Sequence, residues 1–278
     1  MNLIVQGPDV PTPDLKQLAK LTGATAIEAV TPTAFRLVGA DPGQRAAVAA
    51  YCEENGHDHG WVPAGRRIGD FGLLVMDMDS TLITIECIDE IADMHGLKPQ
   101  VSAITEAAMR GEIDFAESLR RRVALLGGLE QSALQRVYDE RLQLSPGAET
   151  LLAAVRAAGI KTLLVSGGFT FFTERLKPRL GLDYTAANTL EVADGKLTGR
   201  VLGNIVDAQG KADWLQRVRD ELGLTKAQVV AMGDGANDLK MMAEAGVSIA
   251  YRAKPVVRAQ ASYALNHVGL EGVVPLLG

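Results

Sequence analysis

The stretch Leu73–Thr81 reads LLVMDMDST and decides the fold. Its first four residues form a short, uninterrupted apolar run, which is typical of a strand buried on both faces of a parallel sheet. Three similar runs follow along the chain, at residues 161–165, 229–232 and 247–250, with helical patterns between them. This alternation predicts a doubly wound α/β fold, in which ligands bind at the carboxyl ends of the strands.

Polar residues follow three of these predicted strands directly. DMD (residues 77–79) follows the first strand, SGG (166–168) follows the second, and GDGAND (233–238) follows the third. Because parallel strands end at the same edge of a sheet, we expect the three loops to meet there. Chemistry is therefore predicted at that edge.

Three carboxylates, those of Asp77, Asp79 and Asp234, would lie together in this arrangement. Unpaired carboxylates at such short distances repel one another and shift each other's pKa. A hard divalent cation removes the repulsion, and Mg²⁺ prefers a few carboxylates together with water and phosphate oxygens. The pattern predicts a Mg²⁺ site that also receives a phosphate group.

The remaining polar groups suit a phosphate ester. Ser166 offers a hydroxyl, and the glycines after it offer backbone N–H groups that a ligand can approach closely. Lys211 supplies a compact positive charge for phosphate oxygens. Asp77 as nucleophile would form an aspartyl phosphate, while Asp79 would protonate the departing alcohol and then activate water. The predicted reaction is hydrolysis of a phosphate ester.

Composition excludes several other classes of protein. The formal net charge of −6 and the aromatic content of 5% do not suit a nucleic-acid-binding protein. No apolar run approaches the roughly 18 residues of a membrane-spanning helix, and the first residues lack the pattern of a secretory signal. Cys52 and Cys87 have no metal-ligand spacing, which favours a reducing compartment. We expect a cytoplasmic protein with no nucleic-acid or membrane partner.

The first 66 residues predict a separate small domain. Its expected order is β-α-β-β-α-β, as in a ferredoxin-like α+β unit, and this plan resembles the amino-acid-binding ACT modules. A turn-rich basic linker at residues 63–67 would lead into a second domain over 67–278. We expect two copies of the chain to pair as a homodimer through the first domain. The expected strands are residues 3–6, 25–30, 34–38 and 57–62, and the expected helices are 13–21 and 41–51.

The ordered motifs DxDST, SGG, a lysine and GDGANDLKM together resemble the haloacid dehalogenase (HAD) superfamily of phosphatases. The resemblance implies a HAD-like core and a role for each matching position. Asp77 would be nucleophile and metal ligand, Asp79 acid/base with its backbone carbonyl on the metal, and Asp234 a further ligand. Ser166, Gly167, Lys211 and Asn237 would bind the phosphate end of the substrate, and Asp238 would support the metal or the lysine.

Three further segments narrow the resemblance. Residues 86–92 (ECIDEIA), 109–115 (MRGEIDF) and 118–123 (SLRRRV) are similar to the phosphoserine phosphatase family, and the match extends from about residue 71 to the C-terminus. This implies a helical cap inserted at about 86–144 over the active site. It also implies a Mg²⁺-dependent hydrolase that converts O-phospho-L-serine to L-serine and phosphate, the last step of serine biosynthesis.

Arg122 is singled out by its place on a predicted helix. It shares one helical stripe with Phe115, Leu119 and Leu126, whereas its neighbours in the arginine run point elsewhere. An arginine on an apolar face needs an anion, and a substrate carboxylate suits a bidentate guanidinium.

The family resemblance assigns the same role to Arg122. It also implies that Glu86 receives the substrate ammonium, and that Met109 and Phe115 exclude water when the cap closes.

Other functions use the same residues. A phosphotransferase would pass the phosphoryl group to a second alcohol, and a related phosphatase would prefer phosphothreonine or another small phosphate monoester. A third hypothesis makes the chain an amino-acid sensor with the phosphatase fold as its output. The Glu86 and Arg122 pair favours an amino-acid substrate in each enzymatic case.

Overall fold

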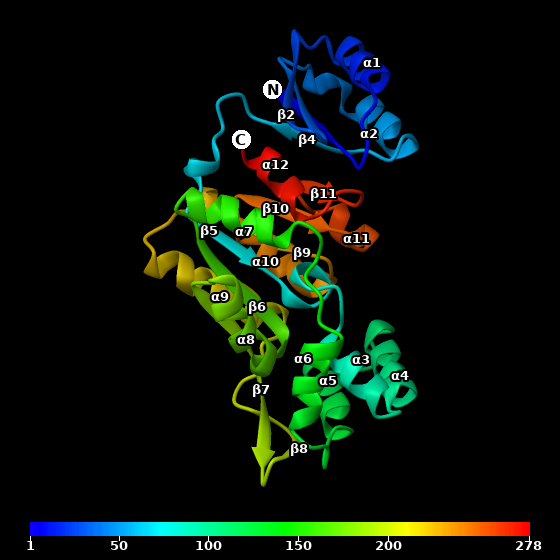
Figure 1. Ribbon diagram of the computed structural model, residues 1–278, viewed down its shortest axis with the longest axis vertical. Helices are drawn as coiled ribbons and strands as arrows, with labels where there is room; N and C mark the ends of the chain where they lie inside the picture. The colour runs from blue at the N-terminus through cyan, green and yellow to red at the C-terminus, as the bar shows by residue number, and fades with distance from the viewer.

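The computed structural model describes residues 1–278 and contains two β-sheets. The molecule is elongated, with the N-terminal domain at one end, the larger sheet in the middle and a group of helices at the other end (Figure 1). No helix has both the length and the apolar character needed to cross a membrane.

The N-terminal domain has the predicted β-α-β-β-α-β order. Its sheet is wholly antiparallel, in the order β2-β3-β1-β4. Leu3 and Val5 of β1 pack under the two helices, whereas Ile4 between them joins the main core of the next domain. The inner strand β1 is therefore covered on both faces. Its elements are β1(Asn2–Gln6), α1(Thr12–Thr22), β2(Ala26–Thr31), β3(Ala34–Val38), α2(Arg45–Glu54) and β4(Asp58–Val62).

The central sheet has seven strands in the order β11-β10-β9-β5-β6-β7-β8. Six of them are parallel, which confirms the predicted doubly wound core, and β8 alone is antiparallel. The tight turn at Asp194 and Gly195, both with positive φ, sends β8 back along β7. The strands are β5(Leu73–Met76), β6(Lys161–Phe169), β7(Tyr184–Ala193), β8(Lys196–Leu202), β9(Val229–Gly233), β10(Val247–Tyr251) and β11(Tyr263–Leu265).

Helices cover both faces of this sheet, as continuous apolar strands require. Leu74 and Met76 pack with α7 and α8 on one face, and Leu73 and Val75 pack with α9 and α10 on the other. The helices of the core are α7(Ala148–Ala157), α8(Thr170–Leu180), α9(Ala208–Glu221), α10(Leu239–Ala243), α11(Pro255–Arg258) and α12(Val274–Leu277).

The predicted helical cap is confirmed as an insertion after β5. Its two connections to the core run side by side, because the Thr84 N–H donates to the Gln143 carbonyl at 2.9 Å and Ile83 pairs with Leu144. Buried apolar residues on each helix build the cap interior. The cap helices are α3(Cys87–Met94), α4(Lys98–Met109), α5(Phe115–Ala124) and α6(Ser132–Glu140).

Candidate active site

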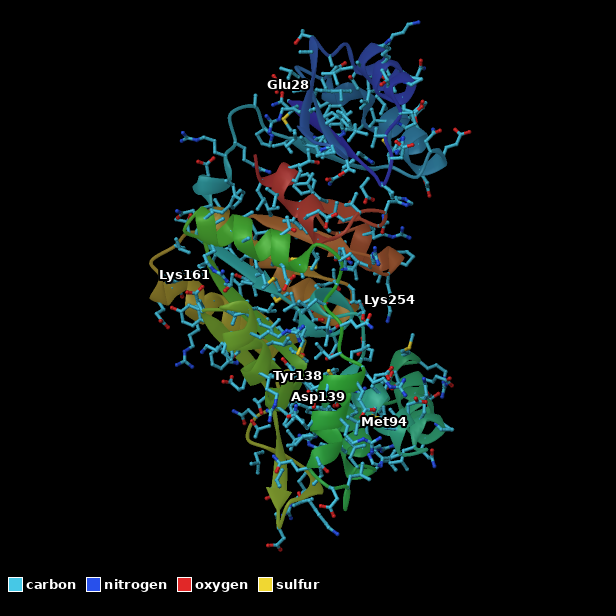
Figure 2. All side chains as sticks on the ribbon, in the orientation of Figure 1. Glu28, Met94, Tyr138, Asp139, Lys161 and Lys254 are labelled. Carbon is cyan, nitrogen blue, oxygen red and sulfur yellow. The ribbon has the colours of Figure 1, made fainter.

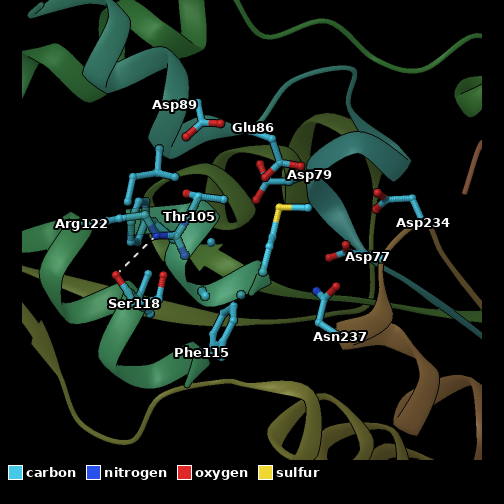
Figure 3. Close-up of a pocket in the computed structure, with 18 of the residues that line it drawn as sticks. Asp77, Asp79, Glu86, Asp89, Thr105, Phe115, Ser118, Arg122, Asp234 and Asn237 are labelled. Carbon is cyan, nitrogen blue, oxygen red and sulfur yellow. Dashed lines mark hydrogen bonds between the residues drawn. The ribbon is translucent and has the colours of Figure 1, made fainter. Parts of the chain in front are cut away.

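One cavity of about 450 Å³ lies between the carboxyl edge of the central sheet and the cap. The core contributes the three predicted loops to its wall, and the cap contributes α3, α4 and α5 (Figure 3). Of the predicted site residues, the following line it: Asp77, Asp79, Glu86, Met109, Phe115, Arg122, Gly167, Asp234 and Asn237. Ser166, Lys211 and Asp238 are fully buried behind this wall.

Asp77 and Lys211 form a buried ion pair at the floor of the cavity. Asp77 follows β5 directly, and its Oδ1 accepts from Lys211 Nζ at 2.6 Å and from its neighbour's backbone N–H at 2.8 Å. The same Nζ donates to Asp238 Oδ1 at 2.7 Å. Lys211, from the first turns of α9, is therefore fixed by two carboxylates. Lys196, the other lysine in this region of the sequence, pairs with Glu130 instead.

The floor carries an excess of buried negative charge. Burial alone would lower the pKa of Lys211, but the facing carboxylates of Asp238 and Asp77 outweigh it and raise that pKa, so the lysine keeps its proton. Burial and the charge of Asp238 raise the pKa of Asp77. The same two causes raise the pKa of Asp234 to about 6. A bound cation would relieve this unfavourable charge.

The residues present fit a hard metal ion. One oxygen from each of Asp77, Asp234 and Asp238 lies within 4.8 Å of the others. Both oxygens of Asp238 already accept, from Lys211 Nζ and from the Gly235 N–H at 3.0 Å. Asp77 and Asp234 are thus the carboxylates that remain free for a metal, and carboxylate oxygens are the ligands that Mg²⁺ prefers.

Asp79 lies on a sharp turn directly after β5. The turn spans Met78–Leu82 and contains Ser80 in a left-handed conformation with φ 55°. Asp79 Oδ1 accepts from the Cys87 N–H at the start of α3 at 3.1 Å, and Oδ2 accepts from Ser166 Oγ at 3.4 Å. Burial raises the pKa of Asp79, which favours the protonated form that a general acid needs.

The two glycines of the SGG loop lie where no larger side chain would fit. A Cβ on Gly168 would lie 2.6 Å from Asp79 Oδ2, and a Cβ on Gly167 would lie 2.8 Å from the Phe115 ring. Ser166 Oγ accepts from the Gly168 N–H at 2.8 Å and does not cap α8, whose preceding residue is Phe169. Ser166 lies within β6, which continues to Phe169 before α8 begins.

Arg122 faces the cavity from α5 without an ionic partner. Its Nε donates weakly to the Ser118 carbonyl at 3.4 Å (Figure 3), and its guanidinium forms no ion pair. Burial lowers the pKa of Arg122, although the nearby acidic residues act in the opposite direction. Arg120 and Arg121 are exposed, as the helical spacing predicted. A half-buried guanidinium without an ion pair has its donors free for an anion.

Glu86 lies just before α3, and its carboxylate is beside Asp79 in the cavity (Figure 3). Its Oε1 accepts from Ser80 Oγ at 2.6 Å. The loss of water around this carboxyl and the charge of Asp79 raise the pKa of Glu86 to about 7. At the rim, Met109 is 70% exposed, so it contacts the cavity only from its edge, whereas Phe115 lies within it.

Sequence reasoning missed several supporting residues. Asn188 of β7 donates to the Gly167 carbonyl at 2.8 Å and accepts from the Val206 N–H at 2.8 Å, which fixes the SGG loop. Its position in an ordinary strand gave no signal. Cavity residues outside the predicted set include Asp89, Thr105 and Lys254. Of these three, Asp89 alone lies within a segment matched to the family and could have been selected from the sequence.

A parallel sheet that carries these loops at its edge beneath a helical cap defines a class of α/β hydrolases. The sequence profile of the haloacid dehalogenase-like hydrolases matches residues 74–243, and the chain belongs to this family. Residues 3–48 match a domain of unknown function, DUF4072.

Individual relatives narrow the assignment. A phosphoserine phosphatase from Polaromonas sp. (strain JS666) is 55% identical over 216 residues, which cover 76% of this chain and 92% of the relative. The structure of a probable phosphoserine phosphatase from Vibrio cholerae, in unliganded form, has a TM-score of 0.87 and 40% identity, and covers 99% of this chain and 86% of its own. A HAD-family hydrolase from Salmonella enterica serovar Typhi has a TM-score of 0.90 and 34% identity, covering 99% and 97%. Within the HAD hydrolases, the chain belongs to the phosphoserine phosphatase family.

Proposed function

We propose that the protein hydrolyses O-phospho-L-serine to L-serine and phosphate, the last step of serine biosynthesis, with Mg²⁺ as its metal. The observation that carries this proposal is the pairing of two recognition groups with one nucleophile in a single cavity. Arg122 offers an unpaired guanidinium and Glu86 a carboxylate, and both face the floor that holds Asp77. This arrangement suits a phosphorylated zwitterion.

The substrate would lie with its phosphate on the core and its amino acid part under the cap. Arg122 would bind the carboxylate and Glu86 the ammonium. Around the phosphate, the Gly167 N–H and the Asn237 amide would replace water. Phe115 packs on Gly167, so it would close the cavity between the two ends of the substrate. Met109 would cover the rim when the cap closes.

The reaction would proceed in two displacements at phosphorus. An oxygen of Asp77 forms a bond to phosphorus while the bond from phosphorus to the serine oxygen breaks, and Asp79 gives its proton to that oxygen. Water then attacks the aspartyl phosphate, Asp79 takes a proton from it, and the bond to Asp77 breaks to release phosphate. Lys211 holds the nucleophile in place through its 2.6 Å contact.

The metal site would consist of the carboxylates of Asp77 and Asp234 with the backbone carbonyl of Asp79. When bound, Mg²⁺ supplies positive charge that stabilises the negative charge developing on the phosphoryl oxygens. Asp238, which bonds Lys211 and the Gly235 N–H, would hold the surrounding groups rather than bind the metal.

Product analysis tests the reaction type. We expect equal amounts of L-serine and phosphate from O-phospho-L-serine by NMR, with the same yield of phosphate when a competing alcohol is present in excess. Appearance of a phosphorylated alcohol would instead identify a phosphotransferase. A higher kcat/KM for phosphothreonine than for phosphoserine would overturn the assignment of phosphoserine as the substrate.

We also propose a cytoplasmic homodimer that forms through the N-terminal domain. Cys52 and Cys87 are free and buried, which suits a reducing compartment. The edge strand β2 is exposed along most of its length, with Ile27 40% exposed, and such an edge can pair with a second copy. Light scattering should give the mass of a dimer, and Ile27→Lys should shift it towards a monomer. A monomeric wild type would overturn this proposal.

A further inference from the structure

Ser145 lies outside every motif, on the segment where the chain returns from the cap to the core. It is buried, with 4% of its surface exposed. Its hydroxyl donates to the Thr81 carbonyl at 2.6 Å, and its backbone N–H donates to the Leu82 carbonyl at 3.0 Å. One residue of the cap connection thus binds two successive carbonyls of the turn that follows Asp79.

The turn that Ser145 holds has an unfavourable backbone conformation. Ser80 has φ 55° and ψ 3°, a left-handed conformation that is unfavourable for a residue with a side chain. Such a conformation persists only where its surroundings impose it. The two bonds from Ser145 act at the end of this turn, and the Ile83 N–H bond to the Met78 carbonyl closes it at 3.0 Å.

Thr81 connects this turn to the third motif. Its side chain is fully buried, and its Oγ1 donates to Asp234 Oδ1 at 3.3 Å. Thr81 therefore uses its carbonyl to accept from Ser145 and its hydroxyl to orient a carboxylate on the neighbouring strand. Thr81 holds one oxygen of Asp234, and the other oxygen accepts no hydrogen bond, so it is free for a cation.

We propose that Ser145 is a positioning residue for the metal-binding carboxylate of Asp234 and that it acts through Thr81. This inference rests on the proposed function of Asp234 as a metal ligand. Loss of the Ser145 hydroxyl releases the Thr81 carbonyl, which lets the peptide and its side-chain hydroxyl turn away. Asp234 then rotates freely and binds a cation less tightly, as happens when groups that orient metal ligands are removed.

Metal binding without substrate tests the proposal. Mn²⁺ replaces Mg²⁺ as the probe, because its binding to the substrate-free protein is measured directly by EPR titration. We expect Ser145→Ala to weaken Mn²⁺ binding by about tenfold, the lower end of the usual effect, because it acts through Thr81. Ser145→Thr keeps the hydroxyl and is the matched control, with binding expected within about twofold of wild type.

A double-mutant cycle identifies the route. Thr81→Val removes the hydroxyl with little change in volume and should weaken Mn²⁺ binding by itself. Adding Ser145→Ala to this variant should cause no further loss, because both changes break one pathway. Wild-type Mn²⁺ affinity in Ser145→Ala would overturn the proposal, and so would losses that multiply in the double variant.

Two further measurements distinguish a failure of this inference from loss of the metal site and from misfolding. Asp234→Asn should abolish Mn²⁺ binding; if the wild-type protein binds no Mn²⁺, the proposed metal site fails rather than the role of Ser145. Urea unfolding in EDTA shows whether each variant is folded before titration. Should Ser145→Ala fail to fold, Thr81→Val against Thr81→Ser tests the contact to Asp234 alone, and equal Mn²⁺ affinities in that pair would contradict the inference.

Discussion

At the scale of single residues, our proposal assigns the substrate preference to Arg122. Its guanidinium has no ion pair, so a bound carboxylate would be its first charged partner. We predict that Arg122→Ala raises KM for O-phospho-L-serine by about thirtyfold, because a charge-assisted hydrogen bond contributes about 2 kcal/mol. Steady-state kinetics measures this change.

The neighbouring arginine provides a matched control. Arg120 is exposed on the other side of α5, and Arg120→Ala should leave KM unchanged. An aryl phosphate has no carboxylate, so its KM should not respond to Arg122→Ala. A similar loss for both substrates would show that Arg122 maintains the cap and does not bind the amino acid.

The raised pKa of Glu86 predicts that KM for phosphoserine depends on pH. Its pKa is raised to about 7, so the carboxyl becomes protonated and neutral as the pH falls through that value. A neutral group no longer attracts the substrate ammonium, and KM for phosphoserine should rise by up to about tenfold per pH unit below 7. KM profiles between pH 5.5 and pH 8.5 measure it.

The amide variant tests the assignment to Glu86. Glu86→Gln should have a raised KM at every pH and should lack the rise below pH 7. An aryl phosphate should show no such rise in either protein. If the profile of Glu86→Gln keeps the wild-type shape, another group causes it.

The site residues at strand ends could be predicted from the sequence, whereas the residues that hold them in place could not. Asp77, Asp79 and Asp234 follow apolar runs directly, so topology alone brings them to one edge. Asn188 and Ser145 resemble ordinary polar residues in the sequence, and only the folded chain places Asn188 on Gly167 and Ser145 on the turn after Asp79. Their roles depend on contacts between segments distant in sequence.

At the scale of elements, Asp183 joins the loop after α8 to the start of β6. It accepts from Lys161 Nζ at 2.7 Å and from the Thr162 N–H and hydroxyl at 3.0 and 3.1 Å. Although burial acts in the opposite direction, these bonds lower the pKa of Asp183. A lowered folded-state pKa stabilises the protein above the unfolded value of about 3.9, and this contribution is lost as the pH falls through the folded value.

We therefore predict a pH-dependent effect of Asp183→Asn. It should lower the free energy of unfolding by about 1 kcal/mol at pH 7, since an amide accepts more weakly than a carboxylate. The difference from wild type should shrink as the pH falls below about 4. Urea unfolding at several pH values measures it, and a difference that stays constant with pH would contradict the account.

The antiparallel strand β8 was not predictable from its own sequence. Part of its pairing is with the cap: the Gly128 N–H donates to the Leu197 carbonyl, and the Leu197 N–H donates to the Leu129 carbonyl, both at 2.8 Å. Gly199, with φ 83°, allows the close approach of the Ala124 carbonyl. A strand stabilised by a distant insertion shows no local pattern that reveals its direction.

At the scale of the whole molecule, Asp58 fastens the N-terminal domain to the core. Its carboxylate accepts from the backbone N–H groups of Asn266, His267 and Val268 at 2.8–3.0 Å. We predict that Asp58→Ala lowers the free energy of unfolding by about 2–3 kcal/mol, because three N–H groups lose their charged acceptor. Urea unfolding measures this change.

The shared core predicts that both domains unfold together. Ile4 and Val62 of the N-terminal sheet belong to the same apolar cluster as Tyr263 and Leu276. A single transition is therefore expected in wild type, and the exposed Asp9→Ala should leave it unchanged as the control. Two separate transitions in the wild-type protein would contradict a shared core.

The two domains were predictable from the sequence, but the contact between them was not. Apolar patterns predicted the order of elements along the first domain and four strands of the central sheet, because each buried face repeats locally. The docking of β4 depends on Gly60, where a Cβ would lie 2.4 Å from Leu276 and 2.9 Å from the Tyr263 ring. This match between surfaces has no periodic signal in the sequence.

The central claim is that Asp77 transfers the phosphoryl group of phosphoserine. The most direct test measures phosphate release from O-phospho-L-serine by wild type and by Asp77→Asn. Each protein is assayed with Mg²⁺ and with EDTA, and an aryl phosphate serves as the comparison substrate. The account predicts turnover that requires Mg²⁺, strongly favours phosphoserine and falls below detection in Asp77→Asn. Turnover that persists in Asp77→Asn, or that favours the aryl phosphate, would contradict it.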